Sequence, residues 1–346
     1  MPQLAADQYS LKTLDHDDLD LGAGVFDGWE MEYVQLSRGR FAAATREVRL
    51  PGVQMFLEST TVRTHQYGTA RPRSYVFGIP IEMQAAGHFN GEPWCNAICV
   101  FRGDSEIDVV VPAMSLLVVA IDASLIEQRF LLNEGVELPQ RYLQRCAQHA
   151  GAVQRTRLAG ALKDIMQHCL SDTSLLSQAS TRRALQLTIL ELLDPLLTMG
   201  AGCGRPELGP FSRLELVRRA RAYILEHVDM PLQIGDVCQA LRVSRRTLQF
   251  SFQEVLGINP VAWLRLLRLS GARKALQNHQ DLHVRDVLAR WGFWHPSRFS
   301  SEYRQMFLEL PSETLRGLAR TICMPTGDPA YILPATNISP LQNHSP

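Results

Sequence analysis

The sequence predicts an α+β protein, with a β-rich N-terminal domain that also carries helices and an all-α C-terminal domain. Three observations support this prediction. Short apolar segments separated by glycine, proline and asparagine occupy roughly the first third of the chain. Apolar residues then recur at helical spacing, and a glycine-rich segment at residues 200–211 interrupts that periodicity. The 346 residues, 46% of them hydrophobic, suffice for two domains with cores and exclude a chain that is disordered throughout.

The predicted strands lie in the first of these regions. Pro51 and Gly52 give a turn signal after the first strand, and Asn90 with Gly91 gives another. Short strands at regular spacing are typical of a sandwich or barrel, so we expect a cupin-like or barrel domain. Such a domain suits a small-molecule pocket or a dimerisation module. The expected strands are residues 41–50, 53–58, 75–81, 98–101, 107–111 and 116–121.

Helical spacing takes over after residue 124. Leu158, Leu162 and Cys169 fall on one face of a predicted helix, and residues 181–198 predict a second helix with a broad leucine stripe. The stripe has two interpretations: it packs in the core of this domain, or it forms a dimer seam. Pro195 is expected to kink or shorten the second helix near its end. We place a sensing and dimerisation domain at residues 1–199 and a linker at residues 200–211.

The charge is distributed unevenly. The formal net charge is zero, which alone argues against a nucleic-acid-binding protein. Residues 212–320, however, hold 17 Lys and Arg against 10 Asp and Glu, a net charge of +7. Residues 1–211 hold 18 against 24, a net charge of −6, and Asp328 accounts for the remainder. An acidic front and a basic rear predict two domains with different partners. The partner of the basic rear domain is expected to be polyanionic.

The basic region contains two segments with the same design. In each, a short amphipathic helix is followed by a turn and a second helix, which predicts a helix-turn-helix unit. Ser244 is a good N-cap for the second helix of the first unit, and Gly257 ends that helix. We place this domain at residues 212–320, with the units at about residues 232–257 and 284–307. A proline-rich tail at residues 321–346 is expected to be disordered.

These two units resemble the AraC/XylS family of bacterial transcription regulators over roughly a hundred residues. The resemblance is carried by SRRTLQFSFQEVLGINPVAWLRLLRLSGARKAL and DVLARWGFWHPSRFSSEYRQMFLELPSE. In one departure, Leu315 stands before Arg316 where the family usually has tyrosine, a packing position. The resemblance implies recognition helices in successive major-groove segments about 34 Å apart. It also implies an activator that binds promoter DNA and contacts RNA polymerase. A homodimer is the further partner expected from the front domain.

Residues on both second helices are candidates for DNA contacts. Position by position, the resemblance assigns Arg245, Arg246, Gln249, Phe250, Pro296, Ser297, Arg298 and Ser301. Arg246 or Arg298 could pair with guanine O6 and N7, and Gln249 with adenine, each contributing about 1–3 kcal/mol of discrimination. Phe250 could meet a thymine methyl group. The alternative for each residue is a solvated helix face or a phosphate contact without sequence information.

Several front-domain motifs resemble regulators of ethanolamine-utilisation operons within the same family. The motifs are VQMF at residues 53–56, FGIP at 77–80 and GHFNG at 87–91. The resemblance implies ethanolamine as effector and adenosylcobalamin as co-effector; a related regulator with another small effector is the alternative. An ammonium ligand would need carboxylates and aromatic rings, and His65 or His88 could provide a polar or cobalt contact. The candidate effector-binding residues are Glu58, Phe77, Glu82 and Trp94.

Other function classes find little support. The seven scattered cysteines do not form a disulfide framework, and the spacing of histidines and cysteines does not predict a metal site. We expect no enzymatic activity, because no cysteine has the setting that a repair methyltransferase needs and no Ser/His/Asp motif stands out. A repressor remains an alternative to an activator. Without a signal peptide or an apolar segment long enough to cross a membrane, we expect a cytoplasmic protein.

Overall fold

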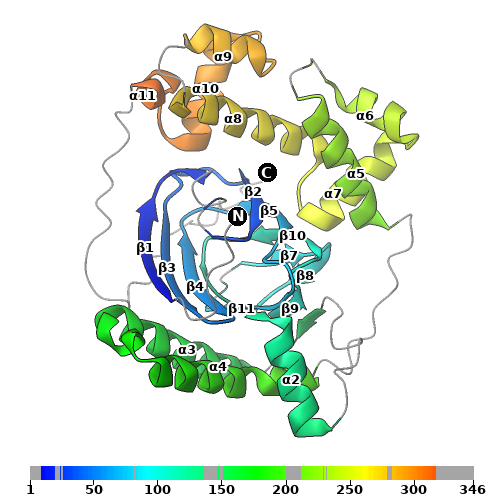
Figure 1. Cartoon of the computed structure of the whole chain (residues 1–346). Coiled ribbons are helices and arrows are strands. Elements are labelled where there is room, and N and C mark those ends of the chain that lie inside the picture. Colours follow the sequence, from blue (N-terminus) through cyan, green and yellow to red (C-terminus); the bar gives the residue numbers. More distant parts are fainter. Residues whose placement is uncertain are drawn as a thin grey trace, which may run out of the picture.

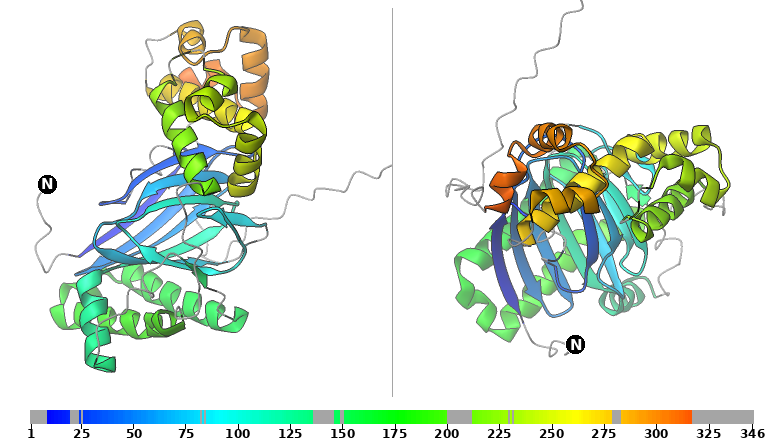
Figure 2. Two further views of the ribbon diagram at one scale, coloured as in Figure 1. Left: turned by 90° about the vertical axis from the view of Figure 1, so that its right-hand side faces the viewer. Right: turned by 90° about the horizontal axis from the view of Figure 1, so that it is seen from above.

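The computed structural model describes residues 9–19, 24, 26–81, 83, 85–135, 146–148, 151–199, 212–228, 230, 232–278 and 283–316. These residues form four layers, in which two β-sheets lie between one group of helices on each side (Figures 1 and 2). The predicted α+β class is confirmed. The β-rich domain consists, in the described residues, of two sheets and not of a barrel.

The larger sheet has seven antiparallel strands in the order β1-β3-β4-β11-β6-β9-β12. Strands β3, β4, β6, β9 and β11 correspond to predicted segments, whereas β1 and β12 were not predicted. The bounds are β1 (Ser10–His16), β3 (Ala43–Leu50), β4 (Val53–Thr60), β6 (Ser74–Pro80), β9 (Ile98–Arg102), β11 (Ser115–Asp122) and β12 (Cys146–Gln148).

The smaller sheet has five antiparallel strands in the order β2-β5-β10-β7-β8. Only β10 was predicted from the sequence. The bounds are β2 (Glu30–Gln35), β5 (Thr64–Thr69), β7 (Gly87–Phe89), β8 (Glu92–Trp94) and β10 (Glu106–Val111). An aromatic cluster that includes Phe56, Phe89 and Phe101 lies between the two sheets.

Helices cover the outer face of the larger sheet. They are α2 (Ala123–Glu134), α3 (Ala152–Ser171), the short 3-10 helix η2 (Thr173–Ser177) and α4 (Ala179–Met199). In α4, the leucine stripe packs into the cluster beneath the sheet, with Ile189, Leu193 and Leu196 almost fully buried. Core packing therefore accounts for this stripe. Pro195 lies inside α4, which continues to Met199, so the proline does not shorten the helix; the expected kink stays a prediction.

The C-terminal helices lie against the outer face of the smaller sheet (Figure 1). They are α5 (Arg213–Glu226), α6 (Ile234–Leu241), α7 (Arg245–Leu256), α8 (Pro260–Asn278), α9 (Val284–Arg290), α10 (Pro296–Phe307) and α11 (Pro311–Leu315). The pairs α6–α7 and α9–α10 are the two predicted helix-turn-helix units. The side chain of Ser244 caps α7 by accepting from the backbone N–H of Thr247 at 3.0 Å, and Gly257 ends it with φ +66°.

Two predicted segments fall outside the described residues. These are the linker at residues 200–211 and the tail at residues 321–346, whose assignments stay predictions. None of the helices in the described part of the chain combines the length and apolar character that a membrane span requires.

Candidate nucleic-acid interface and effector cavity

The first recognition helix, α7, has an apolar inner face and a polar outer face. Leu248 and Phe252 are fully buried, whereas Arg245, Arg246, Gln249 and Phe250 are exposed. This division follows from the helical repeat, which places positions 248 and 252 on one side. The guanidinium of Arg213 in α5 lies 4.7 Å from the centre of the Phe250 ring and also pairs with Glu254. Although Arg213 packs on the Phe250 ring, all four predicted contact residues of α7 remain exposed and open to a ligand.

The second recognition helix, α10, shows the same division. Pro296 occupies its first turn, where the missing N–H of proline costs no hydrogen bond. The inner residues, Phe299, Tyr303 and Phe307, are buried against α8 and α11. The predicted contact residues, all exposed, are Pro296, Ser297, Arg298 and Ser301.

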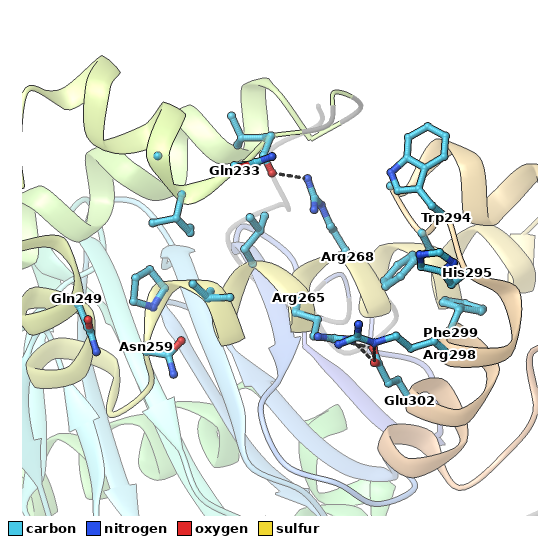
Figure 3. A pocket seen from close by; sticks show the side chains of 18 of the residues that line it. Gln233, Gln249, Asn259, Arg265, Arg268, Trp294, His295, Arg298, Phe299 and Glu302 are labelled. Carbon is cyan, nitrogen blue, oxygen red and sulfur yellow. Dashed lines mark hydrogen bonds and ion pairs between the residues drawn. The ribbon is translucent and has the colours of Figure 1, made fainter. Parts of the chain in front are cut away.

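A groove of about 780 Å³ connects the two recognition helices. Figure 3 shows Gln249 of α7 at one end and Arg298 of α10 at the other, with α8 as the floor. Four arginines line this groove, and Glu302 is the single carboxylate among its lining residues. A groove with this excess of guanidinium groups suits a phosphate backbone. The four arginines are Arg245, Arg265, Arg268 and Arg298.

Arg265, Arg268 and Glu302 are not among the contact residues predicted from the sequence. The two arginines lie three residues apart in α8, a spacing that places them on one helix face. Arg268 donates from Nη2 to the backbone oxygen of Leu232 at 2.9 Å, which ties α8 to the segment before α6. Burial lowers the pKa of Arg268 from its ordinary value. The i, i+3 spacing of basic residues is the signal that could have identified this floor.

The C-terminal helices bind the smaller sheet through a buried polar network. In β5, the Nδ1 atom of His65 accepts a hydrogen bond from the Trp263 indole at 3.0 Å, so Nε2 donates to Asp108 at 2.8 Å. Asp108 of β10 also pairs with Arg221 of α5, which donates to Glu106 at 2.5 Å. Burial opposes ionisation of Asp108, but His65 and Arg221 outweigh it and lower its pKa. We call this interdomain contact the dock; its residues are His65, Glu106, Asp108, Arg221 and Trp263.

The second helix-turn-helix unit also contacts the β-rich domain. The backbone N–H of Gly39 donates to the carbonyl of Met306, in α10, at 2.9 Å. Arg40 lies 3.9 Å from Glu309, which also pairs with Arg273 of α8 at 3.1 Å. Both units therefore rest on the same domain, which restricts their relative movement.

A small aromatic cavity of about 60 Å³ lies between the two sheets. Glu58 and Trp94, two of the predicted effector contacts, both line it. The Glu58 carboxyl is buried and accepts from the Tyr33 hydroxyl at 3.3 Å. Burial raises its pKa to about 7. Among the described residues, no cation pairs with Glu58. The aromatic residues around it are Phe26, Trp29, Tyr33, Phe56, Phe89, Trp94 and Phe101.

The other predicted effector residues lie elsewhere. Phe77 is fully buried in the cluster between the larger sheet and the helices, on the face away from the cavity, so the structure does not bring it to Glu58. Glu82 lies outside the described residues. His65 has both ring nitrogens engaged in the dock, and His88 lies beside Gly257 at the domain contact. No group of three metal-ligating side chains occurs in the described part of the chain.

Known proteins with a similar sequence match the C-terminal region of this chain. Residues 237–317 match a family described as a helix-turn-helix domain. The probable thc operon regulatory protein of Rhodococcus erythropolis is 40% identical over 103 residues, which are 29% of this chain and 31% of that protein. The XylDLEGF operon transcriptional activator 2 of Pseudomonas putida is 30% identical over 99 residues, which are 28% of this chain and 63% of that protein.

A solved structure gives a match of the same extent. It is a probable AraC family transcriptional regulator from Rhodopseudomonas palustris, 31% identical, with 30% of this chain and 95% of that one covered and a TM-score of 0.28. The chain spans about a third of the length of the thc operon protein, and the similarity to that protein and to the Pseudomonas activator is confined to about a hundred residues. Both of these proteins carry the names of operon regulators.

Proposed function

We propose that this chain, whose C-terminal region belongs to the AraC/XylS family of helix-turn-helix regulators, is a transcription regulator that responds to a small effector. The observation that carries the proposal is the pair of exposed recognition helices joined by an arginine-lined groove. Base-reading side chains at both ends and cations between them match the two requirements of specific DNA binding, which are direct readout and phosphate contact.

The exposed residues divide by role. Arg246, Gln249 and Arg298 read base edges in the major groove, because their donors and acceptors can form paired hydrogen bonds with guanine or adenine. Arg245, Arg265 and Arg268 contact phosphates, since they line the groove between the two reading positions. Phe250 meets a thymine methyl group. Pro296, Ser297 and Ser301 form the rest of the second contact.

The effector is a small amine bound in the cavity at Glu58. A buried carboxyl without a cationic partner is costly to ionise, and a ligand ammonium would supply the missing charge. The surrounding aromatic rings would add cation–π attraction. A cavity of about 60 Å³ holds about four to six heavy atoms at about 10–15 Å³ each. Ethanolamine fits this class. Adenosylcobalamin is far larger, so a co-effector role would place it elsewhere on the protein.

A response to this ligand requires coupling between the cavity and the DNA-binding helices. Successive residues of a strand point to opposite faces of a sheet. In β10, Val109 lines the cavity whereas Asp108 and Val110 face the C-terminal helices. In β5, Gln66 lines the cavity whereas His65 and Tyr67 face those helices. A ligand in the cavity therefore lies on the opposite face of the same two strands, β5 and β10, that carry the dock residues His65 and Asp108.

The bound regulator activates transcription of a catabolic operon by contacting RNA polymerase, and the protein binds DNA as a homodimer. The relative in Pseudomonas is named as an operon activator, which supports this direction. Repression is the alternative. A reporter gene behind the target promoter separates the two, because an activator raises expression above the level without protein and a repressor lowers it.

The test of the proposal begins with selection of bound duplexes from a library with randomised sequence. Fluorescence anisotropy then compares a selected duplex with a scrambled one, using the full chain with and without ethanolamine. We expect preferential binding of the selected duplex, two half-sites about 10 bp apart, and loss of preference in Arg298→Ala. The matched control is Arg219→Ala, which removes an exposed arginine of α5 that does not line the groove. Equal affinity of the intact chain for both duplexes would contradict DNA-sequence recognition.

A further inference from the structure

A carboxylate lies where the DNA-binding groove is otherwise cationic. Glu302 is in α10, one turn after Arg298, and lines the groove with the four arginines. A negative charge at this position repels phosphates and so opposes DNA binding. A surface ion pair contributes little to the stability of a fold. A role in folding alone therefore explains the position of Glu302 poorly.

The carboxylate contacts two guanidinium groups from two different helices (Figure 3). Its Oε1 atom accepts from Nε of Arg298 at 2.9 Å, and its Oε2 atom accepts from Nε of Arg265 at 2.6 Å. Burial opposes ionisation of Glu302, but the two arginines outweigh it and lower the pKa of this carboxyl. Glu302 is therefore ionised at neutral pH and joins α10 to α8.

The contact with Arg298 is made by one atom of the guanidinium only. Nε is engaged, whereas Nη1 and Nη2 have no partner among the described residues, and the side chain remains 68% exposed. The two terminal amines are the pair that reaches guanine O6 and N7. Holding an arginine by Nε restricts its rotamers and presents this pair in a fixed direction, which reduces the entropy lost on binding a base.

We propose that Glu302 is a positioning residue that orients Arg298 for base readout and, through Arg265, fixes the second recognition helix relative to α8. This inference rests on the proposed DNA-binding function and adds to it the residue that sets discrimination at the Arg298 position. Glu302 contacts no base in this arrangement and acts through Arg298.

The test compares Glu302→Gln with the intact chain by anisotropy, on the selected and the scrambled duplex. Affinity for the selected duplex is expected to fall roughly fivefold, because Arg298 is no longer held by a charged partner. Affinity for the scrambled duplex is expected to rise roughly twofold, because one negative charge leaves the groove. The ratio of the two affinities thus falls by about tenfold. A purely structural residue would lower both affinities together.

Two further variants separate geometry from charge. Glu302→Asp keeps the charge but withdraws it from Arg298, so the ratio should fall while affinity for the scrambled duplex stays unchanged. In the Arg298→Ala background, Glu302→Gln should cause no further loss of the ratio, since the oriented group is absent. The matched control is Glu226→Gln, which removes an exposed carboxylate of α5 outside the groove.

The outcomes distinguish this inference from the proposed function. Discrimination by the intact chain that persists in both Glu302 variants, or an undiminished effect of Glu302→Gln in the Arg298→Ala background, would overturn the positioning role and leave DNA recognition intact. Absence of discrimination in the intact chain would overturn the proposed function and this inference with it. Thermal melting of each variant verifies that it is folded.

Discussion

The indole N–H of Trp263, in the helix that joins the two helix-turn-helix units, donates to Nδ1 of His65 in the smaller sheet at 3.0 Å. Both side chains are fully buried. The two residues are far apart in the sequence, and each belongs to a different functional part of the chain. This bond, with the His65–Asp108–Arg221 contacts behind it, makes the position of the DNA-binding helices dependent on the effector domain.

Trp263→Phe is expected to destabilise the chain by about 1–3 kcal/mol beyond its loss of packing, because His65 Nδ1 would remain buried without a donor. Chemical denaturation of the full chain measures the change. Trp291→Phe provides the control, since the buried indole nitrogen of Trp291 has no partner in the described structure and the same substitution removes no hydrogen bond. Equal losses in the two variants would show that the Trp263–His65 bond contributes nothing.

Asp108→Asn should also destabilise the chain, through the loss of a buried charge. Its carboxylate is buried and pairs with Arg221, whose side chain is only 6% exposed, so the substitution leaves a buried guanidinium with Glu106 as its remaining carboxylate partner. We expect a loss of about 3 kcal/mol in the free energy of unfolding. The low pKa of Asp108 adds a pH dependence, because its stabilising contribution is present above the unfolded pKa and is lost as the pH falls. Thermal melts between pH 3 and 7 should show a weaker decline in the variant than in the intact chain.

The fold was predicted where one physical signal dominated. Strand β11 (SLLVVAID) is a nearly continuous apolar run, and the sequence identifies it. Strands β2 (EMEYVQ) and β5 (THQYGT) carry polar residues at most positions. Some of those polar residues are buried by tertiary contacts, His65 in the dock and Gln66 beside the cavity, which the sequence does not show. The smaller sheet was therefore largely missed.

The candidate site was predicted to the extent that it lies on local helices. Ser244, Leu248 and Gly257 specify one recognition helix by capping and spacing alone, so its outer face follows. The Arg298–Glu302–Arg265 arrangement depends on how α8 packs against α10, and the role of Asp108 depends on pairing between strands. Such relationships arise from tertiary contacts and have no signature in a single sequence.

Two exposed residues in the N-terminal half of α7, Arg245 and Gln249, allow a separation of phosphate contact from base readout. Arg245→Ala should weaken binding to selected and scrambled duplexes alike and reduce the dependence of log affinity on log salt concentration by about one unit. Gln249→Ala should leave the salt dependence unchanged and lower the affinity for the selected duplex by about 1–3 kcal/mol. Salt titrations monitored by anisotropy distinguish the two. Identical behaviour of both variants would contradict the assigned roles.

The pKa of about 7 at Glu58 leads to two opposite effects of pH. The folded chain holds the Glu58 proton more tightly than the unfolded chain, whose glutamate has an ordinary pKa near 4.5. Stability therefore falls as the pH rises from about 4.5 to about 7, by about 3 kcal/mol in total, and this contribution is constant above that range. Glu58→Gln should abolish this decline in denaturation experiments.

Binding of an amine should depend on pH in the other direction, because only the ionised carboxylate attracts an ammonium group. Calorimetric titration with ethanolamine should give an affinity that rises between pH 6 and 8 and then levels off, as Glu58 loses its proton. Glu58→Gln should remove both the binding and its pH dependence, whereas Glu92→Gln, at an exposed carboxylate of β8, should preserve them. Binding that is independent of pH in the intact chain would place the ligand away from Glu58 and show that the cavity serves another molecule.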